Sequence, residues 1–226
     1  MSVRTIEQLE AALTEELKWR RREIQQWEGV ARSVREHELA AVLRGGLSIV
    51  YGHWEGYVKA AAAMYLEFVA RKGLSISQLR PELAAVALRG LLGSGESSKK
   101  SSDHTRIVVA LREKSLEPAR LPYDRATIRT FSNLSFDRFE DIMHSIGCDA
   151  SGHEIHRSLI DNRLLKNRNS IAHGREQYVT IDDWKTIQER VFDILADVRT
   201  QISNAAAVGA YLRVDPGVPK PRHALE

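Results

Sequence analysis

Residues 38–73 read ELAAVLRGGLSIVYGHWEGYVKAAAAMYLEFVARKG, and this stretch decides the fold. Its apolar residues follow a helical pattern, so we expect one long helix from about Glu38 to Lys72 that stops at Gly73. A glycine inside a helix costs about 1 kcal/mol relative to alanine. The glycines inside this helix therefore indicate that another helix or a ligand comes close to it; they are Gly45, Gly46, Gly52 and Gly56.

Long helices are predicted on both sides of this stretch. An apolar stripe runs from Val3 to about Leu39, and Thr180 with Asp183 opens a last helix that continues to about Leu212. No alternating strand pattern occurs. The chain is therefore predicted to be all-α, an antiparallel up-and-down bundle with long first, second and last helices. Shorter helices are expected over residues 81–92, 103–114, 136–146 and 154–172.

The composition fits one globular domain. Hydrophobic residues make up 43% of the 226 residues, enough for a core without metal or disulfide support. We expect a single helical domain over residues 1–213 and a loose, proline-containing tail over 214–226. Cys148 is the only cysteine, which excludes an internal disulfide and favours a reducing cytoplasm. The apolar run from Val58 to Ala70 contains two charges and is too short for a membrane span.

Basic residues outnumber acidic ones only slightly. The net charge of +3 permits a polyanionic partner without demonstrating one. Residues 18–22 read KWRRR, which fits either a nucleic-acid patch or a solvated face with Trp19 beneath the arginine stems. We favour the solvated face. Residues 93–102 are predicted to form a flexible loop by composition, suited to a mobile basic flap over a substrate.

The chemistry is concentrated in residues 167–174, which read NRNSIAHG near the end of a predicted helix. A guanidinium beside an imidazole suits a phosphate. Arg168 and His173 are five residues apart, about 500° of helical rotation, which leaves them roughly 140° apart. They can reach one groove only if the helix ends at His173, or if a second helix supplies the other wall.

Histidines also gather between the predicted helices of the second half, at His144, His153 and His156. No pair of histidines shares a helix face with a carboxylate partner at metal-binding spacing. We therefore expect neither a metal site nor a cofactor.

Two stretches resemble a known family. The pattern arginine, polar residue, three residues, histidine, here Arg168 to His173 with Asn169 as the polar residue, resembles the signature of the HEPN superfamily of all-α domains. Residues 51–59, YGHWEGYVK, resemble the second-helix pattern of its MAE-type branch, typified by MAE_28990 and MAE_18760. The two matches together span about residues 40–200.

The resemblance implies a metal-independent endoribonuclease, often the toxin of a toxin–antitoxin or phage-defence system. Arg168 would hold the scissile phosphate and His173 would act as general acid or base. Asn169 would position the phosphate or His173, with Glu55 and Ser170 in support. Attack by the ribose 2′-hydroxyl would leave a 2′,3′-cyclic phosphate, so RNA would be cut and DNA would not.

The resemblance also implies a homodimer in which both signature helices line one cleft, with any antitoxin encoded as a separate chain. Two alternatives stay open. One is a non-catalytic HEPN dimer that binds RNA, a nucleotide or a protein. The other is a helical domain that binds a small nucleotide elsewhere on its surface.

Overall fold

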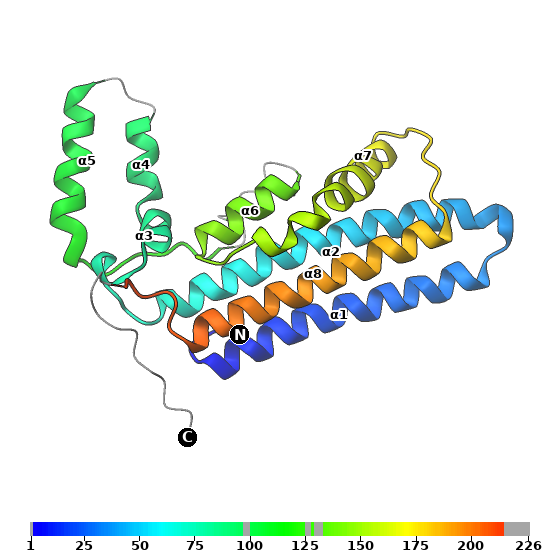
Figure 1. Cartoon of the computed structure of the whole chain (residues 1–226), viewed down its shortest axis with the longest axis horizontal. Coiled ribbons are helices and arrows are strands. Elements are labelled where there is room, and N and C mark those ends of the chain that lie inside the picture. Colours follow the sequence, from blue (N-terminus) through cyan, green and yellow to red (C-terminus); the bar gives the residue numbers. More distant parts are fainter. Residues whose placement is uncertain (1, 97–99, 125–127, 129–132, 215–226) are drawn as a thin grey trace.

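Three long helices form the body of the molecule. The computed structural model describes residues 2–96, 100–124, 128 and 133–214. Helices α1 (Ile6–Ser33), α2 (Glu36–Ala70) and α8 (Ile181–Ala207) lie against one another, and α1 runs opposite to the other two (Figure 1). The predicted all-α fold with long first, second and last helices is confirmed, and successive rods alternate in direction as expected.

Capping residues set the ends of these helices. Thr5 caps α1 through a capping box with Gln8, and the Thr180 hydroxyl accepts a hydrogen bond from Asp183 N (3.0 Å) at the start of α8. The chain leaves α2 through Gly73, whose φ of +65° is a left-handed conformation that suits glycine. The first helix is shorter than predicted, because the chain breaks at Val34 and Arg35 rather than at Leu39.

Helix α2 lies at the centre of the core. Its Trp54 side chain is fully buried, 5.0 Å from the Phe139 ring, and the indole donates a hydrogen bond to Leu134 O (3.0 Å). Burying an aromatic side chain of this size contributes about 2–3 kcal/mol. Trp54 therefore ties the segment before residue 136 to the middle of α2.

The fourth rod is broken rather than continuous. It consists of α6 (Phe136–Ser145), the 3₁₀ segment η4 (Ser151–His156), the π-helix η5 (Leu159–Leu165) and α7 (Lys166–Ala172). The expectation of one regular helix over 154–172 is therefore wrong in its first half. Two side chains of η5 hold the rod in place. Asp161 Oδ1 accepts from Phe136 N (2.8 Å), and Arg163 Nη2 lies 2.5 Å from Asp183 Oδ1.

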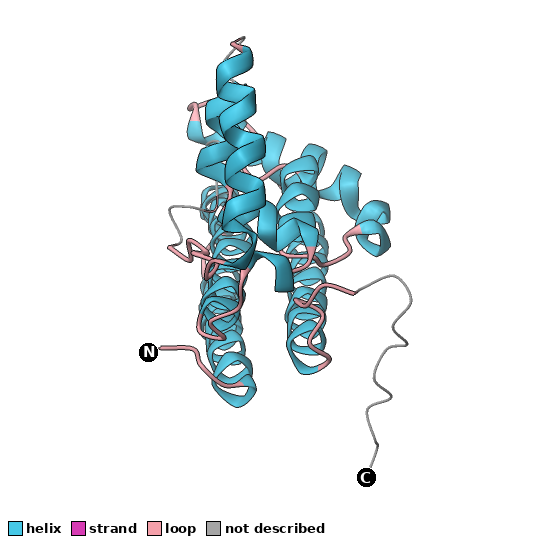
Figure 2. Cartoon of the chain, turned by 90° about the vertical axis from the view of Figure 1, so that its left-hand side faces the viewer, coloured by secondary structure: helices cyan, strands magenta, loops and turns pink. Residues whose placement is uncertain are grey.

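A helical hairpin projects from one end of the bundle (Figure 1) and rises above the long helices in the view along the bundle (Figure 2). After η1 (Ile76–Gln78), it comprises α3 (Pro81–Ala87), α4 (Arg89–Glu96) and α5 (Ser101–Glu113), followed by η2 (Lys114–Leu116). The prediction of a loop over 93–102 is wrong where the chain is described, because α4 continues to Glu96 and α5 begins at Ser101; residues 97–99 lie outside the described residues. The hairpin exposes large apolar side chains, namely Leu92, Val108, Val109, Leu111 and Leu116.

The basic run at residues 18–22 is divided between core and surface. Arg20 is 3% exposed and donates from Nη1 to Glu16 O (2.7 Å), while Lys18, Arg21 and Arg22 are exposed. The Arg20 guanidinium lies 4.3 Å from the Trp19 ring centroid. Trp19 does contact an arginine, as expected, but the interpretation of the whole run as a solvated face is wrong for Arg20.

A loose C-terminal tail and the absence of a membrane span were also predicted. The predicted tail lies outside the described residues except for Val214. None of the described helices combines the length and the apolar character that crossing a membrane requires.

Candidate functional site

The signature helix α7 ends one residue before His173. His173 occupies the C-terminal cap, and Gly174 follows with φ +70°. Gly174 N donates to Ile171 O (3.0 Å) and Arg175 N donates to Ser170 O (2.9 Å), which is the Schellman pattern that satisfies the last carbonyls of a helix. The sequence therefore fixes where the imidazole leaves the helix.

Arg168 is half-buried and held on three sides. Its Nη1 donates to Asn169 Oδ1 (2.8 Å) and to Asn133 Oδ1 (3.1 Å). Its Cζ lies 3.9 Å from the centroid of the Tyr51 ring, close enough for a cation–π interaction of about 0.5–2 kcal/mol. Arg168 thus joins α7 to the centre of α2 and to the turn before α6.

A hollow of about 500 Å³ opens beside Arg168 on the surface of α2. Its lining residues are Ser48, Tyr51, Gly52, Glu55, Gly56, Lys59 and Arg168. Gly52 forms part of this lining, and a Cβ at Gly52 would meet nothing within 4 Å. Glu55, predicted as a supporting residue, lines the same hollow, with Lys59 Nζ 3.8 Å from its Oε1. We call this the α2 hollow.

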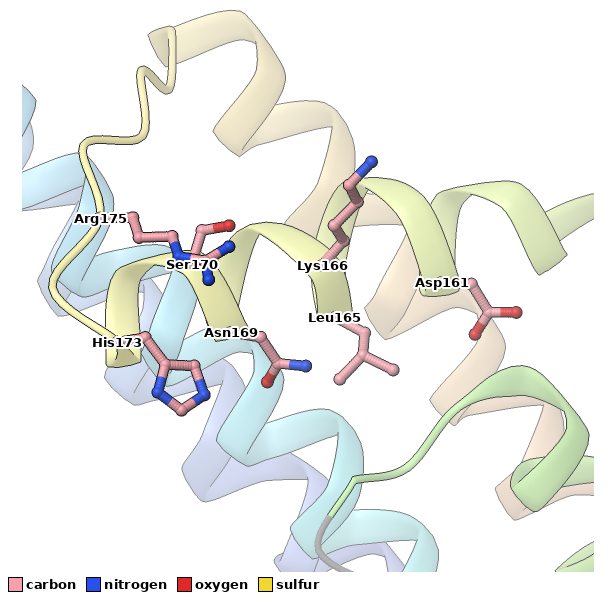
Figure 3. Close-up of a pocket in the computed structure, with 7 residues that line it drawn as sticks. All are labelled: Asp161, Leu165, Lys166, Asn169, Ser170, His173 and Arg175. Atoms are coloured by element: carbon pink, nitrogen blue, oxygen red, sulfur yellow. The ribbon is translucent and has the colours of Figure 1, made fainter.

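His173 lies at a second hollow, of about 340 Å³ (Figure 3). Asn169 and His173 point to the same side of α7, and the Arg175 side chain folds back toward Ser170. The His173 side chain is exposed. Arg44 Nη2 donates to Arg175 O (3.1 Å), which fastens the segment after the helix to α2. The lining residues are Asp161, Leu165, Lys166, Asn169, Ser170, His173 and Arg175; we call this the α7 hollow.

Arg168 and His173 therefore line different hollows of one chain. Ending the helix at His173, as the sequence predicted, does not bring the two side chains into one hollow. Asn169 connects the two hollows, since it lines the α7 hollow and accepts a hydrogen bond from Arg168. Ser170 also lines the α7 hollow, whereas Glu55 lies on the side of Arg168. The guanidinium that lines the α7 hollow with His173 is that of Arg175. A single ligand atom can meet the Arg168 guanidinium and the His173 imidazole only if another surface is added.

Sequence reasoning missed Tyr51 and Asn133. Tyr51 is buried, and burial raises the pKa of its phenol, with the Glu55 carboxylate raising it further. The Tyr51 hydroxyl accepts a hydrogen bond from Leu134 N (2.7 Å), which places Asn133 beside Arg168. Tyr51 lies in the stretch that carries the family resemblance, so that stretch could have identified it. Asn133 has no such signal, because it lies in an irregular segment 35 residues before Arg168.

The histidine group does not form a metal site in the described part of the chain, where no set of three His, Cys, Asp or Glu side chains is arranged to hold a metal ion. His153 is buried, and burial lowers the pKa of its imidazole. Its Nε2 lies 3.3 Å from Gln201 Nε2 of α8. His144, in contrast, is exposed on α6.

The comparisons with known proteins agree with this architecture at the level of the family. No curated protein and no solved structure matches the chain significantly. The family model of the MAE_28990-like HEPN domains matches residues 9–211, which include both hollows, the whole of α2 and α8, and all of α1 except its first three residues. The chain is therefore a member of the MAE_28990-like HEPN family.

Proposed function

We propose that the protein is a metal-independent endoribonuclease that works as a homodimer, with the α7 helices of two copies at the interface. The observation that carries the proposal is the pair of hollows on either side of α7. Arg168 opens to the α2 hollow and His173 to the α7 hollow. A second copy supplies the missing wall, so that Arg168 of one protomer and His173 of the partner subunit meet at one phosphodiester.

The chemistry combines Arg168 of the α2 hollow with His173 and Asn169 of the α7 hollow. The ribose 2′-hydroxyl attacks the adjacent phosphorus, the bond from phosphorus to the 5′-oxygen breaks, and a 2′,3′-cyclic phosphate and a 5′-hydroxyl result. His173 takes or gives the proton as general base or acid, a contribution of about 10²–10⁴-fold in rate. Arg168 stabilises the charge that develops on the phosphate, while Asn169 orients its guanidinium. Since the nucleophile belongs to the substrate, DNA is left intact.

Cleavage of labelled RNA in the presence of EDTA tests the activity. Wild-type protein is expected to cut, and His173→Ala is expected to lose at least about 100-fold in rate. Because His173 is exposed, this variant should keep the thermal midpoint of the wild type. A wild type that cuts no RNA and is harmless when expressed would instead identify a non-catalytic dimer that binds RNA, a nucleotide or a protein.

Mixed dimers test the shared site. Arg168→Ala and His173→Ala are co-expressed with different tags, and the heterodimer is purified through both. One intact pair, Arg168 from one copy and His173 from the other, remains in this heterodimer. We expect it to cut RNA although neither variant does so alone. A purified heterodimer as inactive as its parents would show that each protomer uses its own pair.

The biological role that we propose is that of a toxin in a toxin–antitoxin or phage-defence system, with a separately encoded antitoxin. Growth arrest on expression, relieved by His173→Ala, is the expected observation. Unimpaired growth with active, soluble enzyme would contradict the toxin role and leave the ribonuclease chemistry intact.

A further inference from the structure

The partners of Arg168 are all uncharged among the described residues. Its two hydrogen bonds go to the amide oxygens of Asn133 and Asn169, and a neutral ring lies against its face. No carboxylate of the described residues comes within ion-pair distance of it. We call Asn133, Asn169 and Tyr51 the neutral cradle.

Two other arginines that are buried or half-buried, Arg20 and Arg80, are each paired with a carboxylate, whereas half-buried Arg44 donates to the backbone carbonyl of Arg175. Arg20 Nη1 lies 3.0 Å from Glu16 Oε1, and Arg80 Nε lies 2.8 Å from Glu82 Oε2. Arginines that serve only the fold are usually paired in this way, because a charge taken out of water needs a counter-charge. Arg168 departs from that pattern at the edge of an open hollow.

The carboxylate of Glu55 lines the same hollow but has partners other than Arg168. Glu55 has Lys59 Nζ at 3.8 Å, and its charge acts on the hydroxyl of Tyr51. Only Nη1 of Arg168 has hydrogen-bond partners among the described residues. A guanidinium carries five N–H donors in a fixed fork, so donors remain for a bidentate contact with phosphate oxygens.

The cradle is fixed by parts of the chain that are far apart in sequence. Leu134 N donates to the Tyr51 hydroxyl (2.7 Å), and the Trp54 indole donates to Leu134 O (3.0 Å). These two bonds hold the backbone next to Asn133 on α2. The side chain of Asn133 then meets Arg168 from α7. The guanidinium is therefore oriented before any ligand arrives, which reduces the entropy lost on binding.

We propose that the neutral cradle keeps the Arg168 guanidinium free of a counter-charge, so that an RNA phosphate supplies that charge on binding. Asn133 and Tyr51 are positioning residues in this arrangement, and neither touches the reacting atoms. The inference rests on the proposed function in taking RNA as the ligand. It extends that function by assigning Asn133 a role in substrate affinity. An aspartate would have nearly the same shape at this position but would carry a charge, which the amide does not.

The decisive variant is Asn133→Asp, which places a carboxylate where the amide oxygen now accepts from Arg168. Binding is measured with a 2′-O-methyl RNA, which lacks the attacking hydroxyl and is not consumed. We expect affinity to fall by about tenfold, the order expected for a contact between charged groups. The slope of log K against log salt concentration should become shallower by about 0.7, the value for one phosphate contact on a single strand. The thermal midpoint should stay equal or rise, since an ion pair is gained.

Asn162→Asp is the matched control. It introduces the same charge in η5, at an exposed residue whose side chain bonds only to Ser158 among the described residues (3.2 Å). It should leave RNA affinity and the salt slope close to wild type. Equal losses in both aspartate variants would mean that general repulsion of RNA is responsible, and would overturn the inference.

Further outcomes separate the inference from the proposed function. Asn133→Asp with wild-type affinity and slope overturns the cradle even if the enzyme cuts RNA. Binding that depends on Arg168 and Asn133 in a protein that cuts no RNA supports the cradle and overturns the ribonuclease. If Asn133→Asp fails to fold, Asn133→Ala is tested in its place. Weaker RNA binding with a raised KM and an unchanged kcat would support the inference. Unchanged binding would overturn it.

Discussion

The two sides of helix α2 use glycine in opposite ways. On the side toward α1 and α8, a Cβ at Gly46 would lie 2.7 Å from Trp184 Nε1 and closer still to Trp27 Nε1. On the open side, a Cβ at Gly52 would meet nothing. The first glycine allows indoles to pack against the helix backbone. The second stands at the lining of a hollow, in space that the described residues leave open.

Polar side chains on the two sides also differ in their exposure. His53 is buried on the packed side, between the rings of Trp19 and Phe192. On the open side, Glu55 and Lys59 remain partly exposed and pair with each other. A helix with one side packed by aromatic rings and another kept open and charged is organised for stability on the first side and for binding on the second.

The largest effect is expected at the packed side. Gly46→Ala should lower the free energy of unfolding by about 3 kcal/mol, since two rigid indoles would have to move. Urea unfolding followed by circular dichroism measures this. A loss below about 1 kcal/mol, the usual scale of a surface change, would show that the indoles adapt easily and that the packed side is not tightly fixed.

The second prediction concerns pH. Burial and the nearby Arg20 charge lower the pKa of His53 to about 4 in the folded state, against about 6.5 in an unfolded chain. Glu23 Oε2 lies 3.0 Å from His53 Nε2, but this carboxylate is half-exposed, so burial prevails. As pH falls from 6.5 toward 4, the unfolded chain binds the proton and the folded chain does not. The His53 contribution to stability should therefore decline by up to about 3 kcal/mol over that window.

His53→Leu provides the comparison, because leucine does not titrate. Its stability should depend less on pH between 6.5 and 4 than that of the wild type, while the two curves run parallel above pH 7. The measurement is urea unfolding at half-unit pH intervals. Curves that remain parallel through the acid window would show that His53 takes up a proton as readily in the folded protein as in the unfolded chain, and would contradict the prediction.

The sequence predicts the packed side better than the open side. Helix periodicity and capping residues such as Thr180 and Gly73 mark the rods, because they act through local backbone geometry. The π-helix η5 was missed, since its register depends on Asp161 and Arg163 bonding to other helices. The burial of Arg20 was missed for the same reason. An arginine in the sequence looks the same whether its side chain faces solvent or packs against another helix.

For the candidate site, the sequence predicts which residues carry chemistry and gives only part of their arrangement. The separation of Arg168 and His173 around the helix follows from their spacing and agrees with the two hollows. The contact of Arg168 with Asn133 does not follow from it, because it joins segments 35 residues apart. The glycines of α2 indicated that another group comes close to this helix. Only the three-dimensional structure shows that this is so at Gly46 and not at Gly52.

The third prediction tests whether the open side receives a ligand. Gly52→Phe should fill part of the α2 hollow and weaken binding of 2′-O-methyl RNA by about tenfold, or about 1.4 kcal/mol. Gly29→Phe is the matched control, because a Cβ at Gly29 in α1 also meets nothing within 4 Å and Gly29 is exposed. Both variants should be equally stable. Equal RNA affinity in the two variants would show that no RNA enters the α2 hollow.

The smallest effect is expected from Gly52→Ala. The added methyl group meets no neighbour, and alanine favours the helix, so the free energy of unfolding should rise by about 0.5–1 kcal/mol. Urea unfolding measures this against Gly46→Ala, which makes the same chemical change six residues earlier with the opposite sign. If Gly52→Ala were destabilising instead, the space beside Gly52 would already be occupied in solution, and a second copy of the chain would be the first occupant to test. If it is stabilising, the comparison of RNA affinity between Ala and Phe at this position measures how closely a ligand approaches the backbone of α2.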